Sequence, residues 1–269
     1  MVLQVPPTKA APTIAWEALP ADYVLPDDPV ENLQQSPLAA ALTDALGAAG
    51  LIQPEMLLGS NFGLVATVNQ KIVVKAPDWL YVPQVYPIAE GKVRRSYTPH
   101  LEGSPVAVVM EFLSDEEGGE LSVRSSPPYG KLYFYEHILQ VPTYVTYDPY
   151  EPSLEVRCLH NGHYVVQTPD AQGRLWIPEL QLWLGIWFGT RLQQTMNWLR
   201  WWDGQGNLLL WSAEQAEQER QRAEQERQRA EQERQRAEQE CQRAEQERQR
   251  AEALAAKLRE LGIDPNTLS

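Results

Sequence analysis

Residues 106–148 follow the order strand, helix, strand, and this order leaves few folds open to the chain. Residues 106–110 form a short apolar run rich in β-branched side chains, which predicts a buried strand that Glu111 ends. After a loop with glycines and prolines, the apolar side chains of residues 131–139 recur at the spacing of one helix face. Residues 143–147 alternate and favour β-structure, so a second strand follows. A strand–helix–strand crossover favours a parallel strand pair, and the sequence therefore predicts an α/β fold.

Further strands and one helix are expected around this unit. Ser36 before Pro37 predicts the start of a helix, with Ser36 as its N-cap, and Gly50 predicts its end. An earlier start near Val30, with Pro37 as a kink, is the alternative. Runs bounded by turn residues predict strands at residues 55–68, 71–74, 79–82, 154–159, 164–167 and 175–177. Because hairpin turns join several of these runs, we expect a mixed sheet core flanked by helices.

Tryptophan is concentrated between residues 180 and 211. Residues 198–202 and 208–211 flank a turn and predict a hairpin. The clustered side chains are Trp183, Trp187, Trp198, Trp201, Trp202 and Trp211. Such a cluster can stack nucleic-acid bases. It is more typical of a protein core or a dimer face, and we favour that interpretation.

Residues 213–252 repeat the seven-residue unit AEQERQR. Its residues are strong helix formers, and each unit pairs a glutamate with an arginine three positions on, as in Glu217 and Arg220. Neither assignment of heptad positions gives an apolar seam. A single charged helix of roughly 75 Å and a coiled coil therefore both stay open. Cys241 replaces an arginine in one unit, which we interpret as a drifted repeat rather than a functional thiol.

The composition is typical of one globular domain with an extension. The chain has 269 residues, 43% of them hydrophobic, and lacks an apolar run of about 18 residues and a secretory signal. Its two cysteines lie in different contexts and do not predict a disulfide framework. We expect a cytoplasmic protein without a membrane span. We also expect a mobile arm over residues 1–20, a globular domain over 21–211 and a long helix over 212–269.

Most of the negative charge lies outside the repeat. The net charge is −13, and residues 212–269 hold 14 acids and 11 bases, so residues 1–211 carry a net charge of −10. Nucleic-acid-binding proteins usually show a basic surface. The acidity therefore argues against simple DNA binding, although a metal site is itself acidic. Arg94 and Arg95 lie in a polar loop, for which solvation is favoured over contact with a phosphate backbone.

Three charged residues beside the predicted strands form a candidate site. Asp78 and Glu111 each follow an apolar run, and Lys131 lies on the predicted helix. Two carboxylates near each other suit a hard cation such as Mg2+. A lysine beside them can stabilise an anionic phosphate or orient a water. No metal-ligand spacing is found among His137, His160 and His163.

This set resembles the site of the PD-(D/E)XK restriction-endonuclease-like superfamily, and within it the Uma-two family of endonucleases. The matching residues are Pro77-Asp78, Pro105 through Glu111-Phe112-Leu113-Ser114, Lys131 with Tyr135, and Tyr147-Asp148-Pro149. The resemblance covers roughly residues 20–205. The superfamily motif has a lysine two residues after the acid, where this chain has Leu113. The resemblance therefore implies that Lys131 takes the role of that lysine.

A restriction-endonuclease-like fold and a metal site follow from this resemblance. It implies that Asp78, Glu111 and the main-chain carbonyl of Phe112 bind Mg2+ or Mn2+. It also implies that Asp78, Glu111 and Lys131 are the catalytic residues of an endonuclease acting on DNA. Superfamily members often carry an acid on the first helix, which makes Glu31 a candidate, although a surface glutamate is the favoured interpretation there.

Two hypotheses about function stay open. In the first, the chain is a metal-dependent endonuclease that hydrolyses phosphodiester bonds. In the second, it is a non-catalytic interaction protein that keeps the fold and uses the long helix to assemble or to tether. The acidic domain and the departure at Leu113 favour the second hypothesis, and the order of acid, acid and lysine favours the first. A homo-oligomer formed through the domain or the helix agrees with both, and a third alternative is that the three charges are ordinary surface groups.

Overall fold

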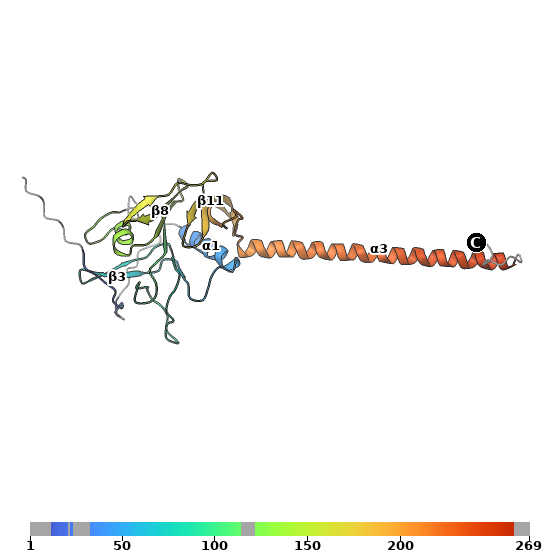
Figure 1. Ribbon diagram of the computed structural model, residues 1–269, viewed down its shortest axis with the longest axis horizontal. Helices are drawn as coiled ribbons and strands as arrows, with labels where there is room; N and C mark the ends of the chain where they lie inside the picture. Colours follow the sequence, from blue (N-terminus) through green and yellow to red (C-terminus); the bar gives the residue numbers. More distant parts are fainter. Residues whose placement is uncertain (1–11, 21, 24–32, 114–121, 261–269) are drawn as a thin grey trace, which may run out of the picture. The chain divides into compact units, whose positions relative to one another are not determined.

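The computed structural model describes residues 12–20, 22–23, 33–113 and 122–260. The chain divides into two compact units, Met1–Ser212 and Ala213–Ser269, and Figure 1 follows the chain through both. The candidate Glu31 lies outside the described residues, as do Ser114 and much of the predicted N-terminal arm.

A six-stranded mixed sheet forms the centre of the first unit. Its strands, in spatial order, are β2 (Leu57–Gly59), β5 (Trp79–Val82), β6 (Val108–Phe112), β7 (Thr143–Asp148), β8 (Ser153–His160) and β9 (His163–Val166). Strands β6 and β7 are parallel, and the other neighbouring pairs of this sheet are antiparallel. The predicted parallel pair and the predicted α/β fold with a mixed sheet are therefore confirmed.

Strand β6 extends further than its apolar run. The sequence predicts a strand over residues 106–110 that Glu111 ends, whereas β6 includes both Glu111 and Phe112. Pairing with β7 explains the difference, because Glu111 lies opposite Thr146 and Phe112 opposite Tyr147. The backbone hydrogen bonds continue where the apolar pattern stops, so a carboxylate is placed within the sheet rather than beyond it.

Two three-stranded sheets complete the described β-structure. One has the order β1 (Ile14–Ala15), β3 (Leu64–Val68) and β4 (Lys71–Lys75), and the other has the order β10 (Leu175–Ile177), β11 (Leu182–Arg191) and β12 (Gln194–Trp202). Strand β1 lies in the segment predicted to be an arm, and pairs with β3. The single strand predicted over residues 55–68 is wrong, because the chain turns near Asn61 (φ 49°) and contributes β2 and β3 to different sheets.

The hairpin predicted from residues 198–202 and 208–211 is present in part, because the N–H of Leu209 donates to the carbonyl oxygen of Trp201 at 2.9 Å across the turn. Strand β12 also pairs with β11 along its whole length, which the sequence did not predict. The turn between them contains Leu192 and Gln193, both with positive φ, a geometry that suits two-residue hairpin loops. Leu208 makes an isolated bridge to Trp202 rather than part of a strand.

Helix α1 (Gln35–Ala48) packs on one face of the central sheet, in a hydrophobic cluster with β6, β7 and β12. The indole nitrogens of Trp201 and Trp211 donate hydrogen bonds to the carbonyl oxygens of Leu42 and Ala41, at 3.2 and 3.0 Å. Both tryptophans are buried in this cluster, as is Trp198. Burial of these three side chains agrees with the favoured interpretation of the tryptophans as core residues.

The predicted start of α1 is wrong by two residues. The N-cap is Gln34, whose carbonyl oxygen accepts the N–H of Leu38 at 3.0 Å, so Ser36 lies inside the first turn. The side chain of Ser36 therefore cannot act as the cap. The predicted end is close, since the helix stops at Ala48 and Gly50 has a φ of 69°.

A short helical segment covers the opposite face of the sheet. It begins as α2 (Lys131–Tyr133) and continues as η1 (Phe134–Ile138), which is a π-helix. The N–H of Leu139 donates to the carbonyl oxygen five residues back, at 2.9 Å. Side chains of this segment pack with those of β5, β6 and β7 in a second hydrophobic cluster. The predicted helix is thus present, but most of it has π rather than α winding.

Helix α3 (Ser212–Glu260) is one uninterrupted helix of 49 residues (Figure 1). None of its residues is buried. Ion pairs with the predicted spacing of three residues join Glu231 to Arg234 at 3.0 Å and Glu245 to Arg248 at 3.1 Å. These pairs stabilise the helix from within the same chain. No helix in the described ranges is both long and apolar enough to cross a membrane.

Candidate functional site

The antiparallel pairing of β5 with β6 brings the two predicted acids together. Trp79 of β5 lies opposite Met110 of β6. Asp78 and Glu111 are the next residues outward, so their side chains project from the same face of the sheet. Both are buried: Asp78 is 7% exposed and Glu111 is 0% exposed. The shared face is the one that α2 and η1 cover.

Two residues of the covering segment hold the Glu111 carboxylate. Lys131 Nζ lies 3.0 Å from Oε2, and the Tyr135 hydroxyl donates to Oε1 at 2.7 Å. The two partners are four residues apart and project from neighbouring positions of the segment. Gly130 lets the chain approach closely here, because a Cβ at that position would overlap the carbonyl oxygen of Ser122. The local fold therefore directs a lysine and a tyrosine at one carboxylate.

Burial raises the pKa of Glu111 to about 7. Loss of hydration is the largest cause; the charge of Lys131 opposes it, and the negative charge of Asp78 adds to it. Burial and the charge of Glu111 together raise the pKa of Tyr135 well above its usual value, so its hydroxyl stays a donor. An added positive charge would lower the energy of the ionised pair of carboxylates.

The backbone of Phe112 contacts both Asp78 on one side and helix α1 on the other. Its N–H donates to Asp78 Oδ2 at 2.6 Å, and its carbonyl oxygen accepts a hydrogen bond from Gln35 Nε2 at 3.1 Å. Gln35 is the first residue of α1 and is buried. The sequence did not point to Gln35, because a glutamine next to a helix start carries no distinguishing pattern.

The donor set fits a hard divalent cation. Asp78 and Glu111 supply carboxylate oxygens, and the carbonyl oxygen of Phe112 has a second lone pair beside its bond to Gln35. Mg2+ and Mn2+ prefer such oxygen ligands and complete their coordination with water. Burial and the charge of Asp78 both raise the pKa of Glu111, and a bound cation would oppose both effects. The residues present are thus compatible with a bound cation, whose ligation stays a prediction.

The basic pair in the loop before β6 is held by other contacts. Arg94 forms an ion pair with Glu102 at 2.5 Å and donates to the carbonyl oxygen of Tyr86 at 2.7 Å. Arg95 donates to the carbonyl oxygen of Tyr23 at 2.9 Å. These contacts give both arginines a role in holding the loop.

The mixed sheet, with Asp78 and Glu111 brought together by two adjacent central strands, is consistent with a restriction-endonuclease-like fold. A sequence profile of the Uma2 family, described as "Putative restriction endonuclease", matches residues 25–193. The chain belongs to this family. Neither the curated proteins nor the solved structures contain a match to the chain.

Proposed function

We propose that this protein is a metal-dependent endonuclease that hydrolyses phosphodiester bonds of nucleic acid, with Asp78, Glu111 and Lys131 as its catalytic residues. The observation that carries the proposal is the convergence of Lys131 and Asp78 on a fully buried glutamate. Structural ion pairs rarely need a second acid beside them, because two buried carboxylates repel each other. A cation bound between the carboxylates of Asp78 and Glu111 would offset their repulsion and explain why both acids are present.

Each residue has a distinct part in the proposed reaction. Asp78 and Glu111 would hold Mg2+ together with the carbonyl oxygen of Phe112, and the bound cation would acidify water and neutralise charge on the phosphate. Lys131 donates to the attacking water or to a phosphate oxygen as negative charge develops there. Tyr135 fixes the rotamer of Glu111, and Gln35 fixes the direction of the Phe112 carbonyl.

The position of Lys131 supports its assignment as the motif lysine. The usual position is Leu113, which cannot donate a proton or carry charge. Lys131 reaches the same carboxylate from the following segment, at 3.0 Å, and 27% of its side chain remains exposed. A partly exposed amine next to a buried acid pair can contact both the site and a substrate.

The test is cleavage of supercoiled plasmid, single-stranded DNA and RNA by the full chain in Mg2+, Mn2+ and EDTA. We expect cleavage that requires metal and falls by at least about 100-fold in Lys131→Met. Lys71→Met is the matched control, since Lys71 is an exposed lysine on β4, and it should cleave like the wild type. Cleavage by Lys131→Met at the wild-type rate would remove Lys131 from the mechanism.

A second function is favoured by one observation, the net charge of −10 over residues 1–211. That charge opposes binding to a polyanion, as expected of an interaction protein that keeps the fold without catalysis. The two functions give opposite results in the same assay. Absence of cleavage of all three nucleic acids, combined with no stabilisation by Mg2+ or Mn2+, would establish the non-catalytic alternative.

A further inference from the structure

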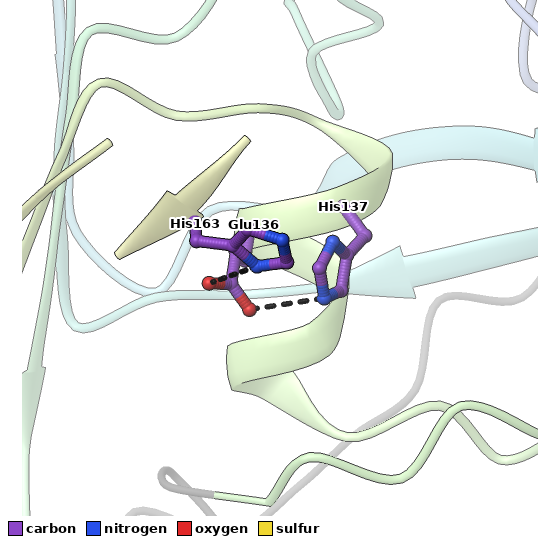
Figure 2. Close-up of side chains that lie close together, drawn as sticks. All are labelled: Glu136, His137 and His163. Carbon is purple, nitrogen blue, oxygen red and sulfur yellow. Dashed lines mark ion pairs between the residues drawn. The ribbon is translucent and has the colours of Figure 1, made fainter. Parts of the chain in front are cut away.

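We propose that Glu136, His137 and His163 form a second metal site, for a divalent transition metal of the zinc type. Glu136 and His137 belong to η1, and His163 is the first residue of β9. Figure 2 shows the two imidazoles turned toward the two oxygens of the same carboxylate. The proposal does not depend on nuclease activity, because none of the three residues belongs to the site of Asp78, Glu111 and Lys131.

The candidate ligand atoms of the three residues lie close together. His137 Nε2 lies 3.0 Å from Glu136 Oε2, and His163 Nδ1 lies 3.8 Å from Glu136 Oε1. One ligand atom from each residue can be chosen so that all three lie within 4.8 Å of one another. Tetrahedral zinc with ligands at about 2.0–2.1 Å needs separations of about 3.3 Å between ligand atoms. Side-chain rotation on ion binding would bring the ligand atoms to that separation.

The kinds of ligand select the metal. Two imidazoles and one carboxylate form a set that binds zinc in proteins, with a remaining position for water. Imidazole nitrogen suits Zn2+, Ni2+ and Cu2+, whereas Mg2+ prefers oxygen ligands. This site and the oxygen-lined site at Asp78 and Glu111 therefore differ in the ions that they prefer.

Two of the three ligands are held in place by neighbours. The N–H of Tyr164 donates to Glu136 Oε1 at 2.6 Å, which orients the carboxylate, and 14% of the Glu136 side chain is exposed. The ring of His137 packs on that of Tyr133, with centroids 4.8 Å apart. His163 follows the turn at Asn161 and Gly162 and is 76% exposed, so it is free to adjust when an ion binds.

The site joins two elements that are distant in sequence. A bound ion would fix η1 to β9, at the edge of the central sheet. Tyr135, the neighbour of Glu136 in η1, donates to Glu111 on the inner side of the same segment. Metal binding should therefore stabilise the segment that presents Tyr135 and Lys131 to the acids.

The test is a titration of the metal-free full chain with Zn2+, in competition with a chromogenic chelator. We expect the wild type to bind one equivalent of Zn2+. The affinity for this ion should fall by about 100-fold or more in His163→Asn, which exceeds the usual effect of removing a residue that only hydrogen-bonds to a metal ligand. His100→Asn is the matched control, since His100 is an exposed histidine on another loop, with a φ of 65° that asparagine tolerates. His163→Asn removes an exposed side chain, so the fold should be retained and circular dichroism will verify it.

Substitution of Zn2+ by Co2+ gives a second, spectroscopic measurement. Visible d–d bands typical of mixed nitrogen and oxygen ligation should appear in the wild type and vanish in His163→Asn and in His137→Asn. Cys241→Ser should keep the bands, because its exposed thiol is not a ligand in the proposal. The proposal is overturned if no equivalent binds, or if the bound equivalent persists in both histidine variants.

Discussion

Glutamate pairs with a basic side chain in two very different parts of this protein. The distance is 3.0 Å both for Glu111 with Lys131 in the first unit and for Glu231 with Arg234 on α3. The exposed fractions of the two glutamate side chains are 0% and 48%. Water and salt screen the pair on α3 and stabilise each partner alone, whereas burial of the Glu111 side chain weakens this screening.

The comparison shows that the surroundings of an ion pair, and not its length, decide what it does. On α3 the pairs stabilise a helix that has no buried residue, and they can be repeated many times. Around Glu111 the charges cost free energy to bury, and a second acid increases that cost. A fold that keeps such a group is expected to use it, as perturbed acids are common at functional sites.

The largest expected difference between the two pairs is in stability. At pH 8, Lys131→Met should lower the free energy of unfolding by about 3 kcal/mol, because Glu111 is left buried without its cation. Arg234→Met is the matched control on α3 and should change it by less than about 0.5 kcal/mol. Urea unfolding followed by the fluorescence of the buried tryptophans measures the first unit. Equal losses in the two variants would contradict the comparison.

The second difference is in the response to pH without metal. The folded pKa of Glu111, about 7, lies above its ordinary value of 4.5. The folded state therefore binds this proton more tightly than the unfolded state does. The contribution of the protonated Glu111 to the free energy of unfolding is complete below pH 4.5 and is lost as pH rises through 7. Relative to Glu111→Gln, the wild type should lose up to roughly 3 kcal/mol over this window.

Unfolding in EDTA at several pH values between 4 and 8 tests this expectation. The matched substitution Glu231→Gln on α3 should show no such window, because that glutamate is in contact with water. If the wild type became more stable relative to Glu111→Gln as pH rises, the raised pKa of Glu111 would be contradicted.

A third, smaller effect concerns the repulsion between the acids. Without metal, Asp78→Asn should raise the free energy of unfolding by about 1 kcal/mol, because one charge is removed and the amide oxygen can still accept the Phe112 N–H. Asp78→Ala leaves that buried N–H without its acceptor, and should be less stable than Asp78→Asn by about 1–3 kcal/mol.

Added metal should make the wild type more stable than both Asp78 variants. Mg2+ at ten times its dissociation constant stabilises a folded protein by about 1.4 kcal/mol, so the wild type should gain in thermal melting curves and both Asp78 variants should not. Equal gains in all three proteins would exclude Asp78 from the binding of the metal.

The smallest effect is expected from removal of residues 213–269. Because α3 has no buried residue, the first unit should unfold at the same temperature within about 2 °C. The response to Mg2+ should also be unchanged. A large drop in the melting temperature of the truncated chain would show that the first unit depends on the helix.

The sequence predicted the candidate residues Asp78, Glu111 and Lys131 better than it predicted their surroundings, and the roles of these residues stay a prediction. Asp78 and Glu111 could be found because each follows an apolar run, and Lys131 because it begins an amphipathic segment. Gln35 could not, since its contact with Phe112 spans 77 residues and depends on how α1 packs on the sheet. The π winding of η1 was not predicted either, because apolar spacing over a few residues does not distinguish it from an α-helix.

The cluster of Glu136, His137 and His163 is a second feature that the sequence did not predict. Their spacing in the sequence gave no metal motif, and we expected none. The approach of His163 to Glu136 is created by the packing of η1 beside β9, between segments 27 residues apart. A search of the sequence for a metal site finds ligands on one element, but it misses ligands that only tertiary structure brings together.

The central claim is that Asp78, Glu111 and the carbonyl of Phe112 bind one divalent cation. Anomalous diffraction from crystals of the full chain soaked in Mn2+ tests it most directly. We predict one strong peak within coordination distance of both carboxylates, and loss of that peak in Asp78→Asn. Anomalous density elsewhere in the molecule but none between Asp78 and Glu111 would contradict the claim.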